Sequence, residues 1–387
     1  MRTLPQVNCA VMAIAALGAA LALSMPARTL AADAPVQEAA AKGAGPTKYP
    51  NQTEGDFTVR DFAFQSGETL PIVRLHYTTL GTPQRDAKGH VTNAVLLLHG
   101  TTGTGKAYFA PSIAGELFGP GQALDASRYY IIVPDGLGRG ASTKPSEGLR
   151  THFPRYGYGD VVAAQQLLVT KELGIDHLRL ILGTSMGGMQ AWMWAERYPD
   201  MVDAIMPIAC QPISISGRNY LFRRIVTEAI RNDPDWNGGD YKTPPRHWLN
   251  TAPLWLMMLE SPVQLQAKGP TRAAANALYD KMVETASKTF DANDFLYWLE
   301  SSWDYDPQPD LGKIKAAVMA VNFADDAINP SDLVVVENLV QSIPTARFVL
   351  VPESERTIGH RTLSLAAIWK PYLEQLLAGT VAPNVPR

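Results

Sequence analysis

The sequence has little cysteine, little charge and only one long apolar run. Its 387 residues include two cysteines, Cys9 and Cys210, too few for a zinc ribbon, an iron–sulfur cluster or a disulfide-stapled miniprotein. The net charge of -3 lacks the basic excess that is typical of nucleic-acid-binding proteins. Hydrophobic residues make up 46% of the chain and charged residues 18%, which excludes disorder and supplies a large core.

The long apolar run lies at the N-terminus. Arg2 precedes an uncharged stretch from Cys9 to Leu23, and small residues follow Pro26. This arrangement predicts a secretory signal peptide over residues 1–32, because the run is too short to cross about 30 Å of hydrocarbon comfortably. Residues 33–50 are rich in Ala, Pro and Gly and are expected to form a flexible lead-in. We therefore expect a periplasmic or secreted protein with no stable membrane span after processing.

Short apolar segments alternate with helix-like segments along the rest of the chain. Strands are expected at residues 57–64, 72–79, 94–99, 129–134, 178–182, 204–209, 317–323 and 347–351. Helices are expected at residues 160–173, 187–197, 330–341 and 363–377. Apolar strands that alternate with helices predict an α/β fold, with a mostly parallel twisted sheet flanked by helices.

This alternation is interrupted once. Residues 211–309 lack clean strands and hold many Trp, Met and Pro residues. We expect this segment to form a helical cap inserted between two parts of an α/β-hydrolase core, residues 51–210 and 310–387. The cap would lie over the carboxyl edge of the sheet, where open α/β sheets bind their ligands.

The most specific motif is Gly183-Thr184-Ser185-Met186-Gly187. It follows an expected strand and opens an expected helix, which is the context of a G-x-S-x-G nucleophile elbow. Such a turn is tight, so small residues must flank Ser185, and the turn raises the serine hydroxyl above the sheet edge. Ser185 is therefore the candidate nucleophile, and the backbone N–H of Met186 is a candidate oxyanion donor.

A serine nucleophile needs a base and an acid that orients the base. Of the seven histidines, His360 stands between the last strand and the last helix, at the sheet edge where Ser185 is expected. The order Ser, acid, His also fits this choice. The acid should follow the strand at 317–323, where Asp325 and Asp326 are adjacent, and the residues alone leave both open.

The second oxyanion donor is expected in the loop after the strand at 94–99. There the backbone N–H of Thr101 is the candidate. No cluster of metal ligands is visible, and this chemistry needs no cofactor. The expected partner is a small acyl ester and no nucleic acid, and a homodimer is left open.

The chain resembles the homoserine O-acetyltransferase-like family of α/β-hydrolases from about Phe64 to Leu377. The resemblance is carried by the stretches 183–190, 197–200, 229–241 and 290–293. It implies Ser185 as nucleophile and His360 as base. It also implies Asp326 as the acid, because the family's acid stands four residues before a proline, here Pro330.

Two features differ from the transferases of that family. Their cap carries an arginine that grips the carboxylate of the substrate, and the matching position here is Pro253, which supplies no such fork. Acetyl-CoA is cytoplasmic, whereas this chain carries an export signal. The sequence therefore favours an exported, esterase-like serine hydrolase that works through an acyl-enzyme. The alternatives are an O-acyltransferase of the homoserine O-acetyltransferase type and a non-catalytic binding protein on a hydrolase scaffold.

Overall fold

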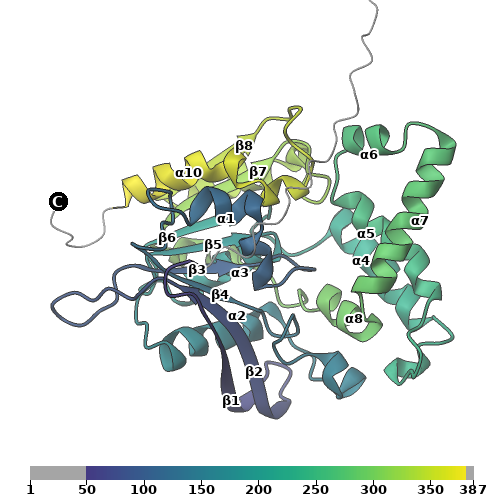
Figure 1. Ribbon diagram of the computed structural model, residues 1–387, viewed down its shortest axis with the longest axis horizontal. Coiled ribbons are helices and arrows are strands. Elements are labelled where there is room, and N and C mark those ends of the chain that lie inside the picture. Colours follow the sequence, from purple (N-terminus) through teal and green to yellow (C-terminus); the bar gives the residue numbers. More distant parts are fainter. Residues whose placement is uncertain (1–48, 381–387) are drawn as a thin grey trace, which may run out of the picture. The chain divides into compact units, whose positions relative to one another are not determined.

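The computed structural model describes residues 49–380. The expected signal peptide lies outside this range, and so does the expected lead-in up to residue 48. The described residues form one eight-stranded sheet with helices around it (Figure 1). No helix among them is long and apolar enough to cross a membrane.

Every expected strand is present, with shifts of a few residues at the ends. The strands are β1 (Thr53–Ala63), β2 (Thr69–Leu80), β3 (Ala94–Leu98), β4 (Tyr130–Pro134), β5 (Leu180–Thr184), β6 (Ala204–Ile208), β7 (Ala317–Phe323) and β8 (Ala346–Val351). Their order in the sheet is β1-β2-β4-β3-β5-β6-β7-β8. The pairs β1–β2 and β2–β4 are antiparallel and all others are parallel. This confirms the mostly parallel α/β-hydrolase sheet.

Helices cover both faces of this sheet. One face carries α1 (Pro111–Leu117) and α10 (Ala366–Gly379), and the other carries α2 (Tyr158–Leu167), α3 (Met186–Arg197) and α9 (Val335–Leu339). Leu96 packs in the core beneath α3, while its neighbour Leu97 packs in the core beneath α1 and α10. Because successive side chains of a strand point to opposite faces, β3 must be apolar throughout, and its five residues are all buried.

The segment between β6 and β7 contains helices and no strand. Its helices are α4 (Gly217–Arg231), α5 (Ala252–Met258), α6 (Pro262–Lys268), α7 (Arg272–Thr289) and α8 (Ala292–Glu300). They gather to one side of the sheet in Figure 1 and have a hydrophobic core of their own, which includes Trp248, Trp255 and Trp298. We call this segment the cap.

One expected helix is broken. Residues 330–341 form a 3-10 turn at Ser331–Leu333, the short helix α9, and a second 3-10 turn at Val340–Ser342. Val334 separates the first two pieces with a left-handed backbone, φ 44°, which is strained for a β-branched residue. The apolar spacing of this stretch is helical, but the spacing carries no signal for this kink.

Candidate active site

Ser185 lies in the tight turn between β5 and α3. Its backbone is in the left-handed region with φ 53° and ψ -116°. The turn allows no side chain on the flanking glycines, because a Cβ on Gly183 would lie 2.1 Å from the Gly187 carbonyl oxygen. A Cβ on Gly187 would lie 1.9 Å from the Leu98 carbonyl oxygen. The motif Gly-x-Ser-x-Gly is thus explained by close backbone packing.

His360 and Asp326 extend from Ser185 in a hydrogen-bonded series. The His360 Nε2 atom is 2.9 Å from Ser185 Oγ, and its Nδ1 atom is 2.8 Å from Asp326 Oδ2. Asp326 lies in the loop after β7, and His360 in the loop between β8 and α10. An ionised carboxylate only accepts, so Nδ1 carries the hydrogen and Nε2 is free to take the serine proton.

The two adjacent acids serve different groups. The Oδ2 atom of Asp325 accepts a hydrogen bond of 2.8 Å from the Gly359 N–H, beside His360. Asp326 contacts the imidazole ring itself. Asp326, which the family resemblance implies as the acid, therefore holds the ring, and Asp325 holds the loop that carries it.

The environment of Asp326 keeps it ionised although it is buried. Burial by itself would raise the pKa of this carboxyl, but the facing His360 ring and hydrogen bonds from His360 and Asn329 lower the pKa below its ordinary value. The Asn329 side chain donates to Asp326 Oδ2 at 3.0 Å, and the Asn329 N–H donates to Oδ1 at 3.1 Å. Sequence reasoning missed Asn329, whose only local signal is its place before Pro330 in the acid's loop.

The two candidate oxyanion donors are the backbone N–H groups of Met186, the residue after Ser185, and of Thr101, which lines the same cavity as Ser185. Met186 is the first residue of α3, so its N–H has no acceptor within the helix. Thr101 follows β3, and within residues 49–380 its N–H makes no hydrogen bond. Gly100, which precedes it, approaches Ser185 so closely that a Cβ there would lie 3.5 Å from Ser185 Cβ. Both donors are thus available for an oxyanion.

His99 fixes the loop that carries Thr101. Its Nδ1–H donates to the Gly100 carbonyl oxygen at 2.8 Å, and its Nε2 accepts from the Gly136 N–H at 2.9 Å. Burial lowers the pKa of His99 to about 4, so the ring stays neutral at pH 7. With both ring nitrogens bonded to backbone, His99 has a structural role.

Ser185, His360 and Thr101 line a cavity of about 940 Å³. The cap supplies much of its wall, which is largely apolar. The apolar cap residues of the wall are Trp255, Leu256, Leu259, Ala274, Ala277, Leu278, Met282 and Phe290. The residues from α7 recur at helical spacing, so one face of this helix borders the cavity.

The charged groups of the cavity are mostly cations. Lys268 and Arg361 both form ion pairs with the buried Glu260 carboxylate, and the Arg361 contact is 2.9 Å. Lys281, from α7, makes no ion pair within the described residues. Pro253 is buried in the first turn of α5 and is not among the residues that line the cavity. Position 253, which matches the carboxylate-binding arginine of the transferases, therefore supplies no cation to this cavity.

One further group of side chains has the composition of a metal site. Ligand atoms of Asp233, Asp235 and His247 lie within 4.8 Å of one another in the cap. The Asp233 carboxylate already accepts backbone hydrogen bonds from Asp235 at 3.0 Å and Trp248 at 2.8 Å. These hydrogen bonds within the loop explain why the Asp233 carboxylate is buried, so its burial is no evidence for a bound ion.

Comparison with known proteins agrees with the geometry. The family model for the alpha/beta hydrolase fold matches residues 93–357, so the chain is an α/β hydrolase. It is 32% identical over 310 residues to a homoserine O-acetyltransferase of Haemophilus influenzae, a match that covers 72% of this chain and 85% of the relative. The protein belongs to the homoserine O-acetyltransferase-like family and is an enzyme of acyl chemistry.

Other proteins similar to this chain include both acyltransferases and an esterase. A probable acyltransferase of Methanothermobacter thermautotrophicus is 29% identical, with 76% of this chain and 89% of the relative covered. The structure of homoserine O-acetyltransferase from Bacillus anthracis superimposes with a TM-score of 0.76 at 22% identity, covering 87% of this chain and all of that one. The acetyl esterase MekB has a TM-score of 0.72 at 26% identity, covering 84% and 97%.

Proposed function

We propose that this enzyme is an O-acyltransferase that carries the acyl group on Ser185 and passes it to a hydroxyl acceptor. The observation that supports this most directly is the series Ser185–His360–Asp326, in which Ser185 and His360 line a cavity whose wall is partly built by the cap. His360 takes the Ser185 proton as Oγ attacks the acyl carbonyl, and the Thr101 and Met186 N–H groups stabilise the oxyanion. The leaving group receives the proton from His360 and the acyl-enzyme remains.

The second half of the reaction uses the same groups in reverse order. The acceptor hydroxyl gives its proton to His360 and attacks the acyl carbonyl, and Ser185 Oγ then leaves and regains a proton. Transfer prevails over hydrolysis only where the acceptor outcompetes water. The apolar cap wall and the acyltransferase relatives support transfer. The relatives therefore favour acyl transfer, the alternative in the sequence analysis, over the esterase that the sequence was expected to encode.

Hydrolysis is the second candidate, and one observation favours it. Pro253 stands where the family's transferases carry a carboxylate-binding arginine, and it does not reach the cavity. Without a guanidinium at this position, the carboxylate of an amino-acid acceptor such as homoserine loses its ion-pair partner. Water would then deacylate the enzyme, as in an esterase.

Product analysis separates the two candidates. The purified enzyme is given p-nitrophenyl acetate with and without butanol or homoserine, and acetyl-CoA with homoserine is run in parallel. We expect acetylated alcohol as the main product when an acceptor is present, with all turnover lost in Ser185→Ala. Acetate as the sole product with every acceptor would establish the esterase. Turnover that survives Ser185→Ala would contradict both candidates, whereas a wild-type protein with no turnover would leave a hydrolase scaffold used for binding.

Export of the enzyme is a separate proposal that rests on residues 1–32 alone. Cleavage near Ala32 would deliver the mature chain to the periplasm or the medium. There acetyl-CoA is not available, so the acyl donor would be an ester. N-terminal sequencing of protein from the periplasmic fraction tests this, and full-length chain found only in the cytoplasm would contradict it.

A further inference from the structure

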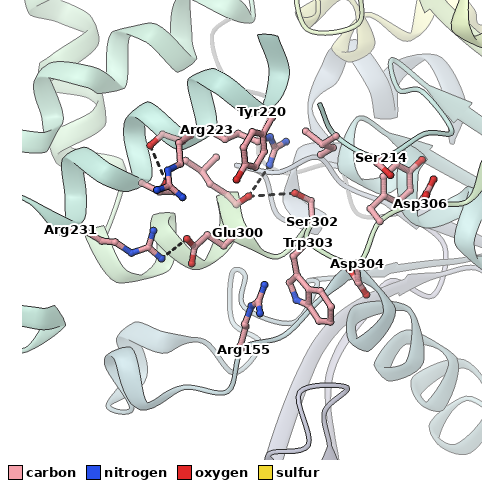
Figure 2. Close-up of a pocket in the computed structure, with 15 residues that line it drawn as sticks. Arg155, Ser214, Tyr220, Arg223, Arg231, Glu300, Ser302, Trp303, Asp304 and Asp306 are labelled. Atoms are coloured by element: carbon pink, nitrogen blue, oxygen red, sulfur yellow. Dashed lines mark hydrogen bonds and ion pairs between the residues drawn. The ribbon is translucent and has the colours of Figure 1, made fainter. Parts of the chain in front are cut away.

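A second cavity, of about 690 Å³, shares no lining residue with the Ser185 cavity. Its residues come from α4 and the loop before it, from the end of α8 and the loop that follows, and from Arg155 in the loop before α2 (Figure 2). Four arginines line it, Arg155, Arg223, Arg224 and Arg231. We call it the arginine cavity.

Part of the charge in the arginine cavity is neutralised by the protein itself. Arg231 pairs with Glu300, and Arg224 pairs with Glu228 at 3.2 Å. The Asp304 carboxylate accepts the Tyr158 and Gly159 N–H groups at 2.8 and 2.7 Å. That carboxylate therefore caps the N-terminus of α2, where a negative charge is favourable.

Two of the arginines have no acid partner. Arg223 is 5% exposed. It donates to Asn219 Oδ1 at 2.9 Å and to the Leu299 carbonyl oxygen at 3.2 Å. Arg155 stacks over the Trp303 ring at 4.7 Å. Neither forms an ion pair with any residue from 49 to 380. Arg223 is thus a buried cation without a counter-ion, which is costly, and an anion from outside would remove that cost.

The arginine cavity also presents flat apolar surfaces. Trp303 is 43% exposed and Tyr220 is 50% exposed, although aromatic side chains of this size are usually well buried. Figure 2 shows Arg155 and Trp303 on one side of the space and Arg223 and Tyr220 on the opposite side. Of the lining acids, Asp304 and Asp306 form no ion pair within the described residues. The Asp304 carboxylate is bonded to the N-terminus of α2, so the carboxylate of Asp306 is the one that neither a cation nor a helix N-terminus holds.

We propose that the arginine cavity binds a small organic anion, in which a phosphate or carboxylate group is joined to a planar ring. The anionic group lies between Arg155 and Arg223, since an arginine fork matches both kinds of oxyanion. The ring packs against Trp303 and Tyr220. The site is distinct from the acyl cavity but adjoins it, because the Arg223 guanidinium also stands 5.7 Å from the ring of Trp255, which lines the wall near Ser185.

Calorimetric titration of the full-length enzyme tests this proposal with four probes. Phenyl phosphate and benzoate carry both features, inorganic phosphate carries the charge alone, and phenol carries the ring alone. We expect saturable binding of phenyl phosphate or benzoate, with the tighter one identifying the anionic group, and weaker binding of the two single-feature probes. Ser185→Ala should bind like the wild type, so the result stands whether or not the proposed acyl transfer does.

The variant Arg155→Ala locates the site, because this exposed side chain can be removed without disturbing the core. Loss of a charge-assisted contact should weaken binding by about tenfold or more. Arg272→Ala, at an exposed arginine of α7 outside this cavity, is the matched control and should bind like the wild type. Melting temperatures verify that both variants are folded. No saturable binding of either ring-bearing anion, or binding that Arg155→Ala leaves unchanged, would overturn the proposal.

Discussion

Asp325 and Asp326 are neighbours in the chain, yet they bond to different parts of one histidine loop. Asp326 contacts the His360 ring at 2.8 Å, while Asp325 accepts the N–H of Gly359 at 2.8 Å. One carboxylate therefore orients the base, and the other fixes the backbone from which the base projects. This division of roles can be tested, because the two residues are chemically identical.

Asp326→Asn should lower kcat/KM for p-nitrophenyl acetate by about 10³–10⁴-fold, because the amide favours the wrong imidazole tautomer and cannot stabilise imidazolium. Asp325→Asn is the matched control and should cost about tenfold or less, since an amide oxygen still accepts the Gly359 N–H. Steady-state kinetics on both variants measures this. Equal losses, or a larger loss for Asp325→Asn, would show that the acid has been assigned to the wrong residue.

Gly187→Ala should destabilise the fold as well as the site. The added Cβ would meet the Leu98 carbonyl oxygen at 1.9 Å, so β3 and α3 must move apart, at a cost of about 1–3 kcal/mol or more. Gly115→Ala, on the exposed face of α1 where a Cβ meets nothing within 4 Å, should instead add about 0.5–1 kcal/mol of stability. Urea unfolding compares the two variants. A Gly187→Ala protein as stable as the wild type would refute the packing argument.

Arg139 is a buried cation that contacts the side chain of Met186, the residue whose N–H is a candidate oxyanion donor. It is 1% exposed, its Nη2 atom lies 3.5 Å from Met186 Sδ, and it forms no ion pair within residues 49–380. Its field should stabilise the negative charge that forms on the acyl oxygen, so we expect Arg139→Met to lower kcat/KM by roughly tenfold.

Arg139→Lys keeps the positive charge but loses the planar guanidinium. It therefore distinguishes an electrostatic role of the Arg139 charge from a role of its side chain in packing. We expect it to recover most of the activity that Arg139→Met loses, measured with the same ester. If lysine and methionine reduce kcat/KM equally while both proteins melt like the wild type, the charge of Arg139 has no part in the reaction.

Acid should weaken the fold through His99. Burial lowers the pKa of His99 from 6.5 to about 4, so below pH 6.5 the unfolded chain binds a proton that the folded chain excludes. Stability is therefore lost as the pH falls from 6.5 towards 4, by about 2 kcal/mol between pH 7 and pH 5.

The control for this prediction is His99→Gln, which keeps an acceptor for the Gly136 N–H but does not titrate. Its unfolding free energy, measured with urea at both pH values, should fall by less than that of the wild type. An equal fall in the two proteins would mean that other groups carry the acid sensitivity.

The sequence predicts the sheet well because parallel strands covered on both faces are continuous apolar segments, as in β3 and β5. It pairs Ser185 with His360 because Ser185 stands directly after a strand and His360 stands in the loop between the last strand and the last helix, at the same sheet edge. The residues alone do not separate Asp325 from Asp326, since the choice depends on the direction in which each side chain leaves the loop, and it is the family resemblance that implies Asp326. Asn329 escapes notice because one of its partners, the Ala209 carbonyl, is 120 residues away.

Other features depend wholly on tertiary structure. The break at Val334 is a left-handed backbone conformation, which the apolar spacing of residues 330–341 does not show. The arginine cavity is equally hidden, because Arg155 lies far along the chain from Arg223 and Arg231. Only the packing of the cap against the loop before α2 brings these side chains to one space.

The acyl-enzyme on Ser185 is the central claim, and peptide mass spectrometry tests it most directly. The enzyme is quenched in acid during turnover of p-nitrophenyl acetate, without an acceptor alcohol, and digested. We predict one acetyl group on the peptide that contains Ser185 in the wild type and in Asp325→Asn, and none in Ser185→Ala. An acetyl group that remains in Ser185→Ala, or turnover without any acetylated peptide, would contradict the account.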